Sequence, residues 1–140
     1  MTLPTVVLAS VLLLCSATSQ KCTTFTEILD ITYLIDKLQE DSASKCNCTG
    51  TSVTSCLCLP IPSDNCTTVC FQEGLSQMTN STAETRYPLI FNRVKKTVLK
   101  NKCQLFSCEQ PCNQTTTGNT LTFLQRLREV LQKQRAMDKV

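Results

Sequence analysis

The chain has 140 residues, a formal net charge of +3 and eleven cysteines, but it has neither histidine nor tryptophan. Without histidine, the chain lacks the general base of serine and cysteine hydrolase triads and a common co-ligand of zinc. The mild positive charge does not indicate nucleic acid as a partner. The length is typical of one domain with a modest aliphatic core, which disulfides would reinforce.

Residues 1–19 read as a secretory signal peptide. The run at 6–14 is mostly apolar and too short to span a bilayer, and residues 17–19 place small side chains at a cleavage site. The alternative is a buried N-terminal helix, because no lysine or arginine precedes the apolar run. We expect a secreted domain over 20–140, without membrane insertion, that begins at Gln20, a residue able to cyclise to pyroglutamate.

Cysteine spacing distinguishes metal sites, redox centres and disulfides. The stretch CNCTGTSVTSCLC, residues 46–58, holds two C-x-C pairs, whereas zinc sites usually space thiols by two to four residues and thioredoxin-like centres use C-x-x-C. A soft metal clamped by C-x-C is the alternative. Loss of Cys15 with the signal peptide leaves an even number, which favours disulfides in an oxidising compartment and no metal or other cofactor. The predicted disulfide cysteines are Cys22, Cys46, Cys48, Cys56, Cys58, Cys66, Cys70, Cys103, Cys108 and Cys112.

Four N-x-S/T motifs support the same compartment, at Asn47, Asn65, Asn80 and Asn113. At Asn47 and Asn65 the middle residue is a cysteine. Early disulfide formation would compete with glycosylation there, so we expect partial occupancy.

Four segments show the 3.6-residue periodicity of amphipathic helices. The first spans about 25–40, where Thr24 and Glu27 have the spacing of a capping box. The second lies within 63–80, with Ser63 or Asp64 as its cap and Gly74 in its interior. The predicted core stripes are Phe25, Ile28, Ile31, Ile35 and Leu38 in the first, and Val69, Cys70, Leu75 and Met78 in the second.

The third segment spans 87–100 and has Pro88 in its first turn, where proline is tolerated. The fourth spans 119–135 and follows Gly118. Their predicted core stripes are Tyr87, Ile90, Phe91, Val94 and Val98 in the third, and Phe123, Leu124, Leu127, Val130 and Leu131 in the fourth.

The connections predict the topology. The first is about two dozen residues long and the third runs from about 102 to 118, so both can return along the bundle, whereas the short link at 80–84 favours antiparallel neighbours. This pattern predicts an all-α, up-up-down-down four-helix bundle with two long crossover loops, held by disulfides. Because long irregular loops cost ordering entropy, we expect at least one disulfide between the two crossovers.

Several stretches carry a specific resemblance, among them ILDITYLIDKLQED, VTSCLCL, RYPLIF, FSCEQPCNQTT and GNTLTFL. Together with the order of the cysteines, they make nearly the whole chain similar to the interleukin-9 family of short-chain helical cytokines. The resemblance implies a monomer that binds the interleukin-9 receptor α subunit and the common cytokine-receptor γ chain. It also implies activation of Janus kinases and STAT factors in lymphocytes and mast cells.

Two features depart from the family pattern. Between Lys96 and Cys103 the chain is three residues shorter than the family, so the third helix is shorter or the attachment of Cys103 is re-aimed. The family has a glycosylation site in the region where this chain has residues 52–54, and Asn47 is the candidate replacement.

The helical wheel predicts which side chains face outward. In the first helix Leu29 and Tyr33 lie opposite the core stripe, and the alternative for them is packing beneath the first crossover. Asp30 and Asp36 are interpreted as solvated residues and not as an acid–base pair, so no enzyme is predicted. In the fourth helix, Thr122, Gln125, Arg126, Glu129 and Lys133 face away from the core.

The basic stretch Arg93, Lys95, Lys96, Lys100 and Lys102 has three readings: a solvated face, a contact with an acidic receptor surface, or a heparin site. The resemblance implies that the third helix faces the α receptor and the fourth faces the γ chain. The predicted receptor-binding residues are Leu29, Tyr33, Asp36, Lys37, Glu40, Arg93, Lys96, Thr122, Gln125 and Glu129. The alternative class is a disulfide-rich secreted inhibitor or lipid carrier.

Overall fold

The computed structural model describes residues 24–48, 56–62, 67–100, 103–106, 108, 110–112 and 116–138. Its fold is all-α, as the periodicity predicted. The elements in chain order are α2 (Phe25–Leu38), β1 (Leu59–Pro60), α3 (Thr68–Gln77), α4 (Thr82–Arg86), α5 (Pro88–Lys100), the 3-10 turn η1 (Gln104–Phe106), β2 (Thr117–Gly118) and α6 (Thr120–Asp138). In the part of the chain that is described, no helix is long and apolar enough to cross a membrane.

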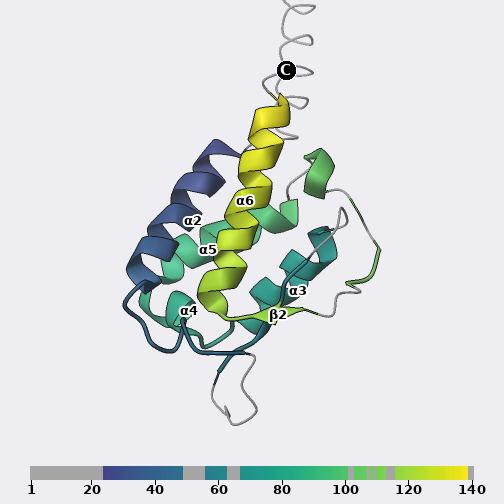
Figure 1. Ribbon diagram of the computed structural model, residues 1–140. Coiled ribbons are helices and arrows are strands. Elements are labelled where there is room, and N and C mark those ends of the chain that lie inside the picture. Colours follow the sequence, from purple (N-terminus) through teal and green to yellow (C-terminus); the bar gives the residue numbers. More distant parts are fainter. Residues whose placement is uncertain are drawn as a thin grey trace, which may run out of the picture.

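The four main helices form a bundle around one core (Figure 1). In Figure 1, α2 and α6 lie side by side and run in opposite directions, while α5 passes behind them. The short α4 follows α3 directly and turns the chain into α5. Long connections before α3 and before α6 bring the chain back along the bundle, which is the arrangement that the loop lengths predicted.

Aromatic side chains from three segments meet in the core. Phe71 of α3 packs edge-on against Phe123 of α6 with ring centroids 5.7 Å apart, and it stacks on Phe106 of η1 at 6.0 Å. All three rings are buried. The stripe predicted for α6 is buried, and Phe91, Val94 and Val98 are buried on α5, so the 3.6-residue pattern of both helices is confirmed. Of the other two residues predicted for the α5 stripe, Ile90 is half-buried, and Tyr87 is half-buried and precedes the helix.

The structure corrects the start of the first helix. Phe25 was predicted to join the core stripe, but its side chain is 56% exposed. Ile31 is six positions further along, and on a helix of 3.6 residues per turn this places Phe25 about 120° away from the core direction. Thr24 makes no side-chain capping hydrogen bond, so the capping box predicted with Glu27 is wrong. Asp30 was predicted to be solvated but is buried.

A cap of the predicted kind occurs instead at α4, a helix that the sequence analysis missed. The Glu84 amide donates to Ser81 Oγ at 3.4 Å, and the Asn80 amide donates to Glu84 Oε1 at 2.8 Å. The S-x-x-E spacing at 81–84 is the signal that could have predicted this start. The second predicted helix also begins later than expected, at Thr68 with Thr67 as the N-cap residue, so a cap at Ser63 or Asp64 is wrong.

The two crossovers are joined by backbone hydrogen bonds. Strand β1 of the first crossover pairs antiparallel with β2 of the second, with Leu59 opposite Gly118. Four described cysteines of the first crossover pair with one another, as Cys46–Cys56 and Cys48–Cys58. These two bonds lie within the first crossover, so neither is the disulfide expected between the two crossovers, which stays a prediction.

The second crossover is fastened to the helices around it. Cys112 bonds to Cys70 of α3, and Cys103 and Cys108 are also disulfide-bonded. The Leu105 amide donates to the buried Gln134 Oε1 of α6 at 2.7 Å, and the Thr67 hydroxyl donates to the Leu105 carbonyl at 3.2 Å. The chain is three residues shorter than the family between Lys96 and Cys103. Even so, α5 extends to Lys100 and Cys103 is buried in the core.

Candidate functional site

The outward face of α2 carries an exposed apolar ridge. Leu29 is 53% exposed and Tyr33 is 42% exposed, so the alternative that they pack beneath the crossover is wrong. Phe25 continues the same i, i+4 line and is also exposed. The sequence analysis did not identify it as a surface residue because it assigned Phe25 to the core stripe. We call Phe25, Leu29 and Tyr33 the α2 ridge.

Each end of the α2 ridge contacts a neighbouring helix. At one end, the guanidinium of Arg135 of α6 lies over the Phe25 ring, 4.6 Å from its centroid. At the other end, Tyr33 packs edge-on against Tyr87, just before α5, with centroids 6.2 Å apart, and the Lys37 ammonium lies 5.3 Å from the Tyr33 centroid. The α2 ridge therefore has one end, at Phe25, in contact with α6, and the other end, at Tyr33, in contact with the start of α5.

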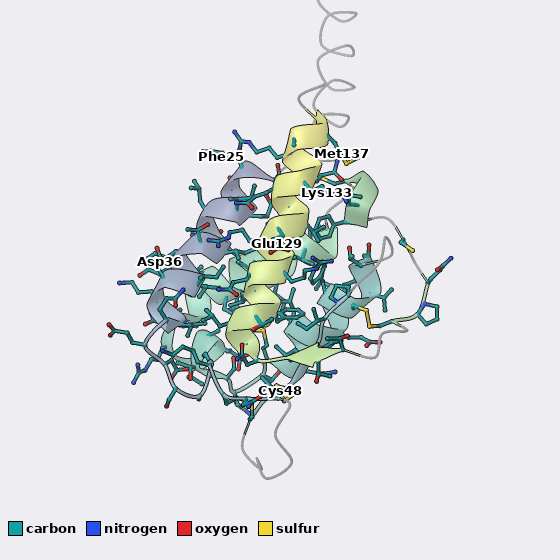
Figure 2. All side chains as sticks on the ribbon, viewed as in Figure 1. Phe25, Asp36, Cys48, Glu129, Lys133 and Met137 are labelled. Carbon is teal, nitrogen blue, oxygen red and sulfur yellow. A yellow bond between two sulfur atoms is a disulfide. The ribbon has the colours of Figure 1, made fainter. Side chains whose placement is uncertain are left out.

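The polar side chains predicted to lie beside the ridge are solvent-exposed. Asp36, Lys37 and Glu40 all fall on the outer side of α2 or just beyond its end. Figure 2 shows Asp36 pointing away from the bundle on the side opposite α3. An apolar strip with a charged margin is the usual composition of a protein–protein contact.

On α5, Arg93 is occupied by a partner within the chain. Its Nε donates to Asp30 Oδ2 at 3.0 Å and its Nη2 donates to Asp30 Oδ1 at 2.8 Å. The hydrogen bonds to Asp30, together with its negative charge, raise the pKa of Arg93 above the ordinary value. Arg93 was predicted as a receptor contact, but the geometry also makes it the link between α5 and α2.

Exposed leucines on α5 were missed by the sequence analysis. Leu89 is 80% exposed and Leu99 is 51% exposed, and both lie off the buried stripe of the helix. A surface depression runs between them. It is lined by Leu89, Asn92, Arg93, Lys95, Lys96 and Leu99. The predicted contact Lys96 is exposed on this face.

The outer side of α6 presents a polar face (Figure 2). Thr122 and Glu129 are exposed, and Gln125 is half-buried. Arg126 donates from Nε to the Pro62 carbonyl at 3.1 Å and from Nη1 to Glu129 Oε2 at 3.0 Å. Arg126 thus fastens the first crossover to α6, and part of the Glu129 charge is neutralised.

The sulfur cluster of the first crossover has a structural role. The sulfurs of Cys48, Cys56 and Cys58 lie within 4.8 Å of one another, a geometry that thiolates could use to hold a metal. All three belong to the two disulfides of that loop, so their sulfurs are not thiolates. The cluster is a disulfide ladder.

Two of the four predicted glycosylation sites are in the described residues. Asn47 and Asn80 are both exposed, and Asn80 has a positive φ of 69° directly before the cap of α4. Asn65, Asn113, Gln20, Cys22, Cys66 and Lys102 lie outside the described residues.

Comparison with known proteins decides the family. A family model described as Interleukin-9 matches residues 2–127. The chain belongs to the interleukin-9 family. It is 67% identical to human interleukin-9 over 132 residues, which covers 92% of this chain and 91% of the human protein. It is 54% identical to mouse interleukin-9 over 134 residues, with 94% and 92% covered.

Membership in the interleukin-9 family makes the exposed faces of α2, α5 and α6 candidate receptor-binding surfaces. This chain is a secreted cytokine and not an enzyme. A cytokine acts by presenting exposed surfaces to receptors, so its functional residues are sought on the outside of the bundle and not in a cleft. The alternative of a secreted inhibitor or lipid carrier is not supported by these relatives.

Proposed function

We propose that this interleukin-9 family cytokine binds a private α receptor and the common cytokine-receptor γ chain, and that joining them activates Janus kinases and STAT factors in lymphocytes and mast cells. The observation that carries the proposal is the α2 ridge, with three large apolar side chains exposed in line. Exposed apolar anchors within a polar rim are typical of interfaces whose binding energy is concentrated in a few residues. The family match supports the same reading.

The two ends of the α2 ridge contact different helices, which suggests how two receptors could bind one small bundle. The end at Tyr33 and Tyr87 continues onto α5, where Lys96 is exposed, and we assign it to the α receptor. The end at Phe25 and Arg135 continues onto α6, and we assign it to the γ chain. A ligand with two such faces can hold two receptor chains at once.

The test changes one face at a time. Gln125→Arg on α6 should abolish most STAT phosphorylation, because a bulky charge near an interface centre can cost about 2 kcal/mol, roughly thirtyfold in affinity. Binding to the α receptor, measured by surface plasmon resonance, should stay within about twofold. Glu129→Arg should act in the same direction, although it also removes the partner of Arg126. The matched variant on α5, Lys96→Glu, should weaken α-receptor binding.

The outcomes separate the alternatives. Loss of α-receptor binding by Gln125→Arg, with γ-chain recruitment intact, would show that the two faces are assigned in reverse. Unchanged signalling and binding in both α6 variants would place α6 outside both interfaces and leave the α2 ridge as the surface to mutate next.

Processing of the N-terminus is part of the proposal. We infer cleavage after residue 19, a product that starts at Gln20 or its pyroglutamate form, and a mature monomer. Intact-mass analysis and size-exclusion chromatography of the secreted protein would test these statements. A product that retains Cys15 would contradict the assigned cleavage site.

A further inference from the structure

The sequence around α5 has an unusual charge balance. Between Thr85 and Cys108 there are six lysines and arginines and no acidic residue. Solvated helices commonly place acidic residues three or four positions from lysines, which stabilises the helix through ion pairs. Lys96 and Lys100 of α5 instead follow each other at i, i+4, and no carboxylate occupies a neighbouring helical position.

The fold directs these two ammonium groups outward. Phe91, Val94 and Val98 bury the opposite side of α5 in the core. Lys96 and Lys100 are both exposed and lie about 6 Å apart along the helix axis. The fixed helix therefore presents a short line of positive charge to solvent.

Two ion pairs within the described ranges join Asp30 to Arg93 and Glu129 to Arg126, and neither includes Lys96 or Lys100. Both carboxylate oxygens of Asp30 accept hydrogen bonds from Arg93. Glu84 of the adjacent α4 accepts from the Asn80 amide. Like charges held close together without counter-charges favour an anionic partner.

A depression beside the line supplies further donors. Its lining includes the side chains of Asn92, Arg93, Lys95 and Lys96, and no carboxylate is among its lining residues. An amide and an ammonium at the rim of a hollow are groups that hydrogen-bond to sulfate oxygens.

We propose that the outward face of α5 binds a sulfated polysaccharide of the heparan sulfate type, through Lys96 and Lys100 with Lys95 and Asn92 as supporting donors. The secreted chain meets polyanions outside the cell, whereas anionic lipids are concentrated in the cytoplasmic leaflet. Membrane-surface helices insert a continuous apolar face, whereas the apolar stripe of α5 is in the core and its outer face has two separate exposed leucines, Leu89 and Leu99, among polar and basic side chains. A linear sulfated chain can follow a straight line of lysines.

The sugar and the α receptor would use the same surface. Lys96 is in the α-receptor face proposed above, so a bound polysaccharide excludes that receptor and holds the cytokine as an inactive reservoir in the matrix. This competition rests on the proposed function, whereas polysaccharide binding by itself does not.

Immobilised heparin measures the first part. The double variant Lys96→Gln/Lys100→Gln should raise Kd about tenfold near 0.15 M salt, and the slope of log K against log salt should become shallower by about one per lysine. The matched control Lys45→Gln/Lys133→Gln removes the same charge at exposed positions in the first crossover and on α6, and should change Kd less than about twofold. Circular dichroism confirms that both variants fold.

Two results would overturn polysaccharide binding at α5. One is equal weakening in the α5 variant and the control, which indicates non-specific attraction to net charge. The other is binding of the wild type to vesicles containing phosphatidylserine but not to heparin, which indicates a membrane surface. For the competition, soluble heparin fragments should displace wild-type protein from the α receptor. Simultaneous binding of both would refute the shared surface, and failure to bind the α receptor without any sugar would refute the proposed function alone.

Discussion

Gly74 lies in the middle of α3, where glycine is disfavoured by about 1 kcal/mol relative to alanine. The backbone gives no reason for glycine, since no glycine in the described residues has a positive φ. The reason is the ring of Phe123. A Cβ at position 74 would overlap Cε2 and Cζ of that ring, and even Cδ2 would be only 3.1 Å away.

Gly74→Ala is therefore expected to destabilise the bundle even though it improves helix propensity. The Phe123 ring is fully buried, so relieving the overlap requires it to leave its rotamer or α3 to move away from α6. Such overpacking typically costs about 1–3 kcal/mol, and the propensity gain offsets about 1 kcal/mol of it. For an overlap this severe we expect a net loss of about 1–2 kcal/mol, and a Tm lower by several degrees.

Chemical denaturation of Gly74→Ala, Phe123→Leu and the double variant forms the test. Because leucine frees the space that the new methyl group needs, the double variant should be more stable than the sum of the two losses predicts, by about 1 kcal/mol or more. Gly74→Ala with stability equal to or above that of the wild type would refute the reasoning, since propensity alone would then govern position 74. Additive losses in the double variant would also refute it.

Three further outcomes are expected. Removing the Cys70–Cys112 bond should lower the free energy of unfolding by about 4 kcal/mol, and removing Cys46–Cys56 should lower it by about 2.7 kcal/mol. The cysteines are 42 and 10 residues apart, and a bond that closes a longer loop restricts the unfolded chain more. Equal losses in chemical denaturation would contradict this. Arg93→Ala should destabilise more than Asp30→Asn, because it leaves a carboxylate buried without its counter-charge, whereas exposed Arg93 can be solvated; thermal melts showing the reverse order would count against it. Burial raises the pKa of Asp41, but hydrogen bonds from Ser44 and Thr82 and the charge of Arg86 outweigh it, so the pKa falls below the ordinary value of 3.8. This stabilisation is complete above pH 3.8 and is lost as pH falls through the lowered pKa, so Asp41→Asn should be less stable than wild type at pH 6 and nearly equal to it at pH 2, as urea unfolding at both pH values can show.

Periodicity determined most of the helical architecture. The apolar stripes of α5 and α6 could be read from the chain because each repeats every three or four residues over a long segment. Loop lengths restricted the topology, since a connection of two dozen residues can cross the bundle and one of five cannot. The outward positions of Leu29 and Tyr33 followed from the same helical geometry, and their exposure is confirmed.

Contacts between distant segments were decided only by the tertiary structure. The sequence did not show that Asp30 pairs with Arg93, because the two residues are 63 positions apart and each alone resembles a solvated charge. Nor could spacing choose which cysteines bond, since pairing depends on which loops the bundle brings together. The local pattern of a chain fixes the direction of a side chain relative to its own helix. What that side chain meets depends on how the helices pack, and the packing sums many weak contacts across the whole core.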